Sequence, residues 1–336
     1  MKELFKHKFF RKNEFYVLLV LIILSLILTV VNPTFLTLDN IFDLLRNNSF
    51  LGILALGELV VLISGGIDVS FTAITTVAQY IMGIIITSYY VDNILLTFLI
   101  PIPIGIILGL INAVLIYITK VHPVIITIAT LNTFYGLLIF FTGGKWMYSF
   151  PPSFTNFAYV KVFQITTPYS VTGFSIFTLF WVIIAILTWF ILKYLPIGRK
   201  IYALGGNPEA ARRVGFNILR IQLFVYGYMG FLSGISAFVH AQLGQIIQPN
   251  AIVGQELDVI AAVILGGASI SGGTGSVFGT ILGVLLFAVI KNGLILMKLP
   301  SYWHQVVVGL IIAIAASFTT YQSRLRSKRM VKIDVE

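Results

Sequence analysis

The sequence predicts an all-α integral membrane protein with about ten transmembrane helices, and three observations support this fold class. The chain is 58% hydrophobic and only 10% charged, whereas about a quarter of the residues of a soluble domain are charged. Its apolar residues form ten separate runs, most of them long enough to cross a membrane. Its basic residues gather on one side when these runs are threaded alternately through a bilayer. Residues 1–336 are therefore expected to form a single transmembrane domain.

The candidate spans follow from length, because crossing a bilayer takes about 20 apolar residues. The first run follows a basic N-terminus, residues 1–14. It lacks a small-residue cleavage site after it, so we expect a retained span and no removed signal peptide. Segment 256–268 is short and is expected to be a broken helix. The candidates are 15–31, 47–63, 71–89, 94–118, 123–142, 172–192, 220–241, 256–268, 276–292 and 301–320.

The charge distribution predicts the orientation. With the N-terminus inside, the inside segments include the basic N-terminus, the loop 196–219 and the tail 321–336. The outside loops hold only Arg46, Lys145, Lys161, Lys291 and Lys298. Positive charge is enriched in cytoplasmic loops, so both termini and loop 196–219 are expected in the cytoplasm. The net charge of +10 then reflects membrane orientation and does not indicate nucleic-acid binding.

Loop 196–219 is the longest polar interruption and carries the signals of a short helix. Asn207 suits an N-cap, Pro208 the first turn and Gly215 a left-handed C-terminal position. Acidic Glu209 and basic Arg212 and Arg213 suit the two ends of the helix dipole. The alternative is a solvated basic loop that only anchors topology. Such a loop needs neither a capped helix nor the double glycine Gly205-Gly206.

Three motifs carry a family resemblance: ALGGNPEAARRVGFN, LISGGIDVS and ELDVIAAVILGGASISGGTGSVFGTILG. They resemble permeases of ATP-binding-cassette (ABC) importers of the ribose and simple-sugar branch, with a type II-like importer fold. The resemblance implies that the short helix docks into a cleft of a separate ATPase subunit. Ala210 and Ala211 would permit close approach. The docking residues it implies are Gly205, Gly206, Asn207, Pro208, Glu209, Ala210, Ala211, Arg212, Arg213 and Gly215.

The resemblance also implies the partners and the compartment. They are a second permease subunit and an extracytoplasmic sugar-binding protein, in the lipid of a bacterial plasma (inner) membrane. The runs LISGGIDVS, TKVHPVIIT and TGGKW look closest to the permease pair that imports autoinducer-2, which implies a heterodimer. Ribose and other pentose importers are nearly as close and allow a homodimer, so the sugar stays open.

An inverted internal repeat is a further expectation. Residues 111–123, INAVLIYITKVHP, resemble residues 291–300, KNGLILMKLP, and LISGGIDVS resembles LGGASISGG. Repeats five spans apart would have opposite orientations, as in many transporters. The alternative is a chance similarity between segments rich in Leu, Ile and Gly.

Small and polar residues inside the apolar runs are candidates for the translocation path. Glycines let the backbone turn, and irregular backbone at membrane depth survives only where protein or a water-filled cavity covers it. The alternatives are close helix packing and ordinary interhelical hydrogen bonds. For Glu58, a hydrogen-bonded packing role is favoured over an ion site. The path candidates are Gly65, Gly66, Asp68, Asn112, Thr127, Asn132, Gly266, Gly267 and Ser271.

The outside basic residues Arg46, Lys145 and Lys161 break the positive-inside bias. They are candidates for contacts with acidic residues of a binding protein, an interaction that acts mainly on encounter rates. The alternative is that they only solvate their loops.

Several functions are disfavoured. The chain has no cysteine and its four histidines show no ligand spacing, so no metal site is expected. It has no phosphate-binding G-x-x-x-x-G-K-[ST] motif, so ATP and Mg²⁺ would bind the partner ATPase and no cofactor this chain. No H-E-x-x-H, G-x-S-x-G or carboxylate dyad indicates an enzyme. The rival class is an ion-coupled secondary transporter, which would need a titratable site and no docking helix. A structural or sensory membrane protein would not need glycine-broken segments.

Overall fold

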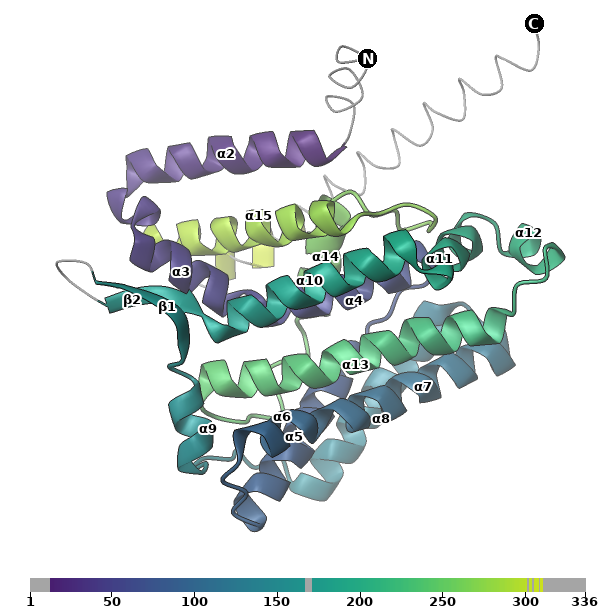
Figure 1. The fold of residues 1–336 in the computed structure, drawn as a ribbon, viewed down its shortest axis with the longest axis horizontal. Coiled ribbons are helices and arrows are strands. Elements are labelled where there is room, and N and C mark those ends of the chain that lie inside the picture. The colour runs from purple at the N-terminus through teal and green to yellow at the C-terminus, as the bar shows by residue number, and fades with distance from the viewer. Residues whose placement is uncertain (1–12, 167–170, 301, 304, 308, 311–336) are drawn as a thin grey trace, which may run out of the picture.

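The computed structural model describes residues 13–166, 171–300, 302–303, 305–307 and 309–310. Long helices lie side by side with their axes roughly aligned (Figure 1). The elements in chain order are α2 (Asn13–Val31), η1 (Pro33–Leu36), α3 (Leu38–Asn47), α4 (Ser49–Ile63), α5 (Phe71–Ser88), α6 (Ile94–Leu99), α7 (Pro101–Thr119), α8 (Pro123–Thr142), α9 (Pro152–Phe157), β1 (Lys161–Thr166), β2 (Val171–Ser175), α10 (Ile176–Tyr194), α11 (Pro196–Gly206), α12 (Pro208–Arg213), α13 (Ile218–Gly244), α14 (Glu256–Leu265) and α15 (Val277–Leu296).

Within the described residues, seven helical segments are long and apolar enough to cross a membrane. An eighth is the pair α3 and α4, which meet at a bend of 48°. Helix α14 has 10 residues and rises about 15 Å, half of a hydrocarbon core of about 30 Å. The expected break in segment 256–268 is therefore confirmed, and this segment does not span. The predicted span 301–320 lies largely outside the described residues.

Helix α4 forms the centre of the bundle, and all of its residues are buried. It contacts α13, α10, α14 and α15, while α13 makes its most extensive contact with α7. That contact depends on small residues. A Cβ atom on Gly230 of α13 would lie 2.1 Å from the carbonyl oxygen of Gly105 on α7. The two backbones therefore touch directly, as small residues permit between membrane helices.

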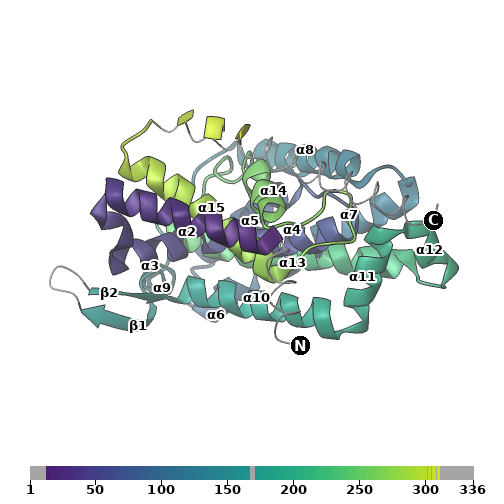
Figure 2. The same ribbon diagram turned by 90° about the horizontal axis from the view of Figure 1, so that it is seen from above.

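Helix α2 lies at the edge of the bundle along α15 (Figures 1 and 2). Its start is held by a hydrogen bond from the Ser276 hydroxyl, which precedes α15, to the carboxylate of Glu14. Many of its apolar side chains are exposed, including Val30 and Leu26, which suits a lipid-facing helix. Helix α2 begins at the end of the bundle where α12 lies (Figure 1).

A two-stranded hairpin, β1–β2, was not expected from the sequence. Its strands pair antiparallel with a bulge between Lys161 and Phe163, and Phe163 stacks on Phe174 with ring centroids 5.6 Å apart. Alternating aromatic and β-branched residues favour strands. The predicted span 172–192 therefore begins only at Ile176, where the Ser175 hydroxyl caps α10.

The two segments compared as a repeat, LISGGIDVS and LGGASISGG, share a local backbone turn. After α4, Gly65 has φ +87° and the amides of Gly65 and Gly66 donate to Leu62 and Val61. After α14, Gly267 has φ +91°, and residues 267 and 268 bond to 264 and 263 in the same pattern. The turns after both helices reach one junction, described below, so this pair of segments is not inverted. Inversion of the chain's halves stays a prediction.

Candidate functional site: the α11–α12 segment and its junction with the spans

Helix α12 forms as the sequence predicts. The Asn207 side-chain oxygen accepts from the amide of Ala210 at 2.9 Å, and Pro208 occupies the first turn. Gly215 takes φ +82°, and the Phe216 amide donates to the Ala211 carbonyl, which ends the helix. The polar stretch before it is also helical. Residues 196–206 form α11, which the basic composition of the loop concealed.

The exposed face of α12 differs in part from expectation. Ala211 is only 2% exposed, so it packs against this chain and does not offer a surface to a partner. Gly206 and Ala210 are exposed. Val214, which the sequence analysis missed, is 68% exposed. An apolar side chain next to a charged helix at the end of a bundle is a candidate contact for another protein.

The charged residues of α12 also pair differently. Glu209 meets Arg213, four residues on, at 3.5 Å, and both side chains are more than 80% exposed. Arg212, three residues after Glu209, does not take part in this pair. Among the described residues, Arg212 has no carboxylate partner and instead lines a cavity beside α12.

A junction of glycines joins α11 to the transmembrane helices. It consists of Gly65, Gly205, Gly272 and Gly273, which we call the glycine junction. A Cβ atom on Gly205 would lie 1.8 Å from the carbonyl oxygen of Ile63, the last residue of α4. The Gly273 amide donates to this same carbonyl at 2.9 Å. Three distant stretches of backbone are therefore in direct contact, with no side chain between them.

A side-chain bond strengthens the same connection. The Tyr202 hydroxyl of α11 donates to the carbonyl of Gly275 at 2.8 Å. Burial raises the pKa of Tyr202, so this phenol stays protonated and remains a donor at neutral pH. Gly275 precedes α15 by two residues. Movement of α11 would thus reach both the end of α4 and the start of α15.

Of the path candidates, Asp68, Asn112 and Thr127 belong to one buried polar cluster. Asp68 accepts from the amide and hydroxyl of Ser70 at 2.7 and 2.6 Å, and the Asn112 amide donates to the same hydroxyl at 2.6 Å. Thr127 accepts from the amide of Val69 at 3.3 Å. The cluster fixes the turn 64–70 between α4 and α5.

Glu58 belongs to this cluster as well. One of its oxygens accepts from the amide of Asp68 at 3.3 Å, which fits the packing role favoured from the sequence. Its second oxygen and the second oxygen of Asp68 are buried without a partner in the described structure. The described residues contain no group of three or more His, Asp or Glu side chains able to hold a metal.

The glycine candidates lie elsewhere. Gly65 packs against Gly205 in the glycine junction, and Gly66 adjoins the hydroxyl of Tyr226. Gly266 packs on α15, where its Cβ atom would lie 2.3 Å from the Gly279 carbonyl, so close helix packing accounts for it. Gly267 forms the turn after α14, and Ser271 is exposed just beyond it. The structure of this one chain therefore does not bring all of the path candidates together.

Asn132 is exposed on α8, as are Ala129, Thr133 and Gly136 on the same face. The Asn132 amide donates to the Ile128 carbonyl at 2.8 Å and the Thr133 hydroxyl to Ala129 at 2.8 Å. Polar side chains of a membrane helix usually face protein or water, because contact with lipid is costly. This face of α8 is therefore a candidate contact with a second subunit.

Two of the three candidate docking residues come together. Arg46 donates to the Ala158 carbonyl at 3.4 Å and Lys161 to the Val171 carbonyl at 2.6 Å. Both line a small pocket of about 190 Å³ beside the hairpin, at the end of the bundle opposite α12 (Figure 1). Lys145 does not line this pocket. It lies between α8 and α9, and its carbonyl accepts from Tyr80.

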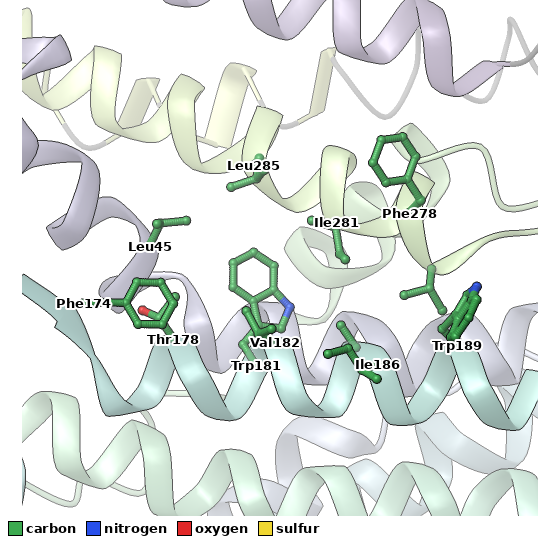
Figure 3. Close-up of a pocket in the computed structure, with 12 residues that line it drawn as sticks. Leu45, Phe174, Thr178, Trp181, Val182, Ile186, Trp189, Phe278, Ile281 and Leu285 are labelled. Atoms are coloured by element: carbon green, nitrogen blue, oxygen red, sulfur yellow. The ribbon is translucent and has the colours of Figure 1, made fainter. Parts of the chain in front are cut away.

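A larger groove of about 550 Å³ runs between α10 and α15. Trp181 and Ile186 from α10 and Ile281 and Leu285 from α15 line it (Figure 3). Its surface is almost wholly apolar, with Thr178 supplying a hydroxyl. It offers few hydrogen-bonding groups to a sugar and suits contact with lipid tails.

Comparisons with known proteins agree with the fold and the motifs. The family model described as "Branched-chain amino acid transport system / permease component" matches residues 40–316. The chain is 35% identical to the ribose import permease protein of Haemophilus influenzae over 305 residues, covering 90% of this chain and 91% of that protein. It is 37% identical to the ribose import permease protein of Bacillus subtilis, with 88% and 89% covered.

A third relative is the autoinducer 2 import system permease protein of Photorhabdus luminescens, which is 28% identical over 300 residues and covers 89% of this chain and 87% of its own. No solved structure matched the chain. The matches and the membrane-crossing helices indicate a multi-pass protein of the bacterial inner membrane. The chain therefore belongs to this family of transport permeases, and the resemblance to ABC sugar permeases that its motifs carry is confirmed.

Proposed function

We propose that this chain is the transmembrane permease subunit of an ABC importer that moves a simple sugar into the cytoplasm. Ribose, another pentose or an autoinducer-2-like molecule are the candidate substrates, by analogy with the relatives. A separate ATPase subunit binds ATP and Mg²⁺ and hydrolyses the nucleotide. An extracytoplasmic binding protein delivers the sugar.

One observation carries this proposal: α12 is exposed at one end of the bundle and is joined rigidly to the spans. Force applied by a partner at Val214 and Glu209 passes through α11 into the glycine junction. From there it reaches α4 through Ile63 and α15 through Gly275. An isolated helix of six residues has little stability of its own. This packed connection therefore holds α12 in place and lets it transmit movement to the spans.

The orientation that we propose is supported by the same arrangement together with the distribution of basic residues. Helix α2 begins at the end of the bundle where α12 lies. The basic segment 1–14 leads into α2, and α12 belongs to the basic loop 196–219. We assign this end, and both termini, to the cytoplasm. The opposite end, with Arg46, Lys161 and the hairpin, then faces the binding protein, and Lys145 is the third proposed contact.

The path itself is proposed to form between two permeases. In this chain, Asn132 and its neighbours on α8 are exposed, which suits a polar lining shared with a second copy or a similar permease. The buried candidates Asp68, Asn112 and Thr127 then act by holding the turn that follows α4. The glycines that pack helices together would allow small rotations without side-chain clashes.

The second candidate function is ion-coupled transport, and the buried pair Glu58 and Asp68 is the observation that favours it. Uptake into proteoliposomes separates the two functions. The permease, the ATPase and the binding protein are reconstituted together, and labelled ribose and autoinducer-2 are supplied in parallel. We expect uptake that requires ATP and the ATPase. Uptake driven by a proton or sodium gradient without ATP would favour the alternative.

A further inference from the structure

A half-open cavity of about 760 Å³ lies beside the docking helix. Its walls come from the turn after α4, the end of α7 and the turn that follows it, Leu204 of α11, helix α12, and the segment from Phe216 to Tyr226 that includes the start of α13. It therefore lies at the end of the bundle where α12 is found (Figure 1). Its volume is within the range of small-molecule sites.

The charged side chains that line this cavity, Lys120 and Arg212, are basic, and a histidine lines it beside them. Lys120 and His122 come from the turn between α7 and α8, and Arg212 comes from α12. No Asp or Glu lines the cavity. The ion pairs of the described residues are Arg213–Glu209 and Lys291–Asp258, so Lys120 and Arg212 have no carboxylate to neutralise them. Two cations from different elements around one space favour an anionic ligand.

Neutral hydrogen-bonding groups line the same cavity. Gln222 and Tyr226 lie one helical turn apart on α13. The Gln222 side-chain oxygen and the Tyr226 hydroxyl are both buried without a hydrogen-bond partner among the described residues. Tyr226 is only 2% exposed. A buried polar group without a partner costs free energy, and a ligand hydroxyl would supply the partner that each of them lacks.

We propose that this cavity binds a phosphate ester of a polyol. The phosphate group lies against Lys120 and Arg212, because a doubly charged anion with several acceptor oxygens can bond to both cations at once. The hydroxyl groups reach Gln222 and Tyr226. Two sources share this chemistry: a sugar phosphate in the cytoplasm, and the headgroup of phosphatidylglycerol in the inner leaflet.

Binding would connect the docking helix to the spans. Arg212 moves with α12, whereas Lys120 belongs to the turn between the spans α7 and α8. A phosphate held by both residues would therefore restrain the movement of α12 relative to these spans. A sugar phosphate would then slow import when the imported sugar has accumulated and been phosphorylated. This consequence rests on the proposed function, whereas the binding itself does not.

The test measures binding to the full chain alone, without the ATPase. The protein is purified in detergent, and ribose 5-phosphate, inorganic phosphate and ribose are titrated by calorimetry at low and high salt. We expect ribose 5-phosphate to bind at least tenfold more tightly than ribose, which corresponds to about 1.4 kcal/mol. Its affinity should fall as salt screens the charges.

A matched pair of lysines supplies the control. Lys120 has φ +56°, a conformation that asparagine tolerates well, so Lys120→Asn removes the charge with little strain. Lys120→Gly is the second variant. Lys193 lies at the same end of the bundle, over the Trp189 ring at 4.8 Å, and does not line the cavity. We expect Lys120→Asn to weaken binding at least tenfold and Lys193→Ala to leave it unchanged.

The lipid arm uses nanodiscs of phosphatidylcholine with and without phosphatidylglycerol. If the lipid headgroup occupies the cavity, phosphatidylglycerol should weaken ribose 5-phosphate binding, and Lys120→Asn should remove that difference. If ribose 5-phosphate binds in detergent and phosphatidylglycerol in nanodiscs does not weaken its binding, the sugar phosphate is the ligand. The proposal is overturned if neither ribose 5-phosphate nor inorganic phosphate binds. It is also overturned if the Lys120 and Lys193 variants lose affinity equally, because any basic residue at this end of the bundle would then have the same effect. Because transport is not measured, failure here leaves the proposed function standing.

Discussion

Replacing Gly205 by alanine tests whether the glycine junction transmits movement. The added Cβ atom would lie 1.8 Å from the Ile63 carbonyl oxygen and 2.7 Å from the Gly273 amide nitrogen. Ordinary contacts begin near 3.4 Å, so α11 and α4 must separate by the difference, about 1.6 Å, at a cost of roughly 1–3 kcal/mol for such overpacking. The bond between Gly273 and Ile63 would be lost with it, which costs about 1 kcal/mol more.

We expect the Gly205→Ala permease to assemble with the ATPase but to fail to couple ATP hydrolysis to sugar uptake. The exposed face of α12, with Val214 and Glu209, is separate from the overlap, so the ATPase should still co-purify with Gly205→Ala. ATP-driven uptake in proteoliposomes should fall at least tenfold at equal permease content. Membrane abundance is measured in parallel, so that a folding defect is recognised.

The neighbouring glycine provides the matched control. A Cβ atom on Gly206 would meet nothing within 4 Å, so Gly206→Ala adds the same methyl group without an overlap. Its uptake should stay within twofold of the parental rate. Parental uptake by Gly205→Ala would refute the role of the glycine junction. An equal loss in both variants would show that the overlap is not the cause.

Three further predictions concern orientation, the buried acids and the binding-protein face. Val214→Cys, in a chain that has no cysteine, should react with an impermeant maleimide in inside-out vesicles and not in intact cells; labelling in intact cells would reverse the topology. Glu58→Gln keeps an acceptor for the Asp68 amide and should retain ATP-driven uptake within twofold, whereas loss of all uptake would favour ion coupling. Charge reversal on the outer face should slow uptake mainly at low salt, because exposed charges act through screened encounter rates; unchanged salt dependence would remove the proposed docking role from Arg46, Lys145 and Lys161.

Local signals predicted helix α12 well. The Asn207 cap, the proline after it and the left-handed Gly215 each act within one or two turns of the backbone, so the residues themselves determine them. Most spans were likewise predictable from apolar length. The same signals could not show that α11 precedes α12, because its positive charge conceals an amphipathic pattern in which Ile201 and Leu204 are buried.

The contacts of the site could not be predicted from the sequence, because they are made by segments that are distant along the chain. Gly65, Gly205 and Gly272 are recognisable one by one as breaks in helices, but their mutual contact depends on how α4, α11 and the 266–276 turn pack. Ala211 was assigned to the partner surface by its small size, although it faces the protein. Val214 was missed because an isolated valine carries no signal, and only its 68% exposure identifies it.

The most direct test of the central claim is a covalent cross-link between α12 and the ATPase. A photoreactive benzoylphenylalanine is placed at Val214, or, as the control, at Tyr159, which is 74% exposed near the hairpin at the opposite end. After illumination of membranes that contain the cognate ATPase and binding protein, we predict an adduct of permease and ATPase from position 214, and none from position 159. An ATPase adduct at 159 with none at 214 would contradict the account, because the docking helix would then lie on the wrong side of the membrane.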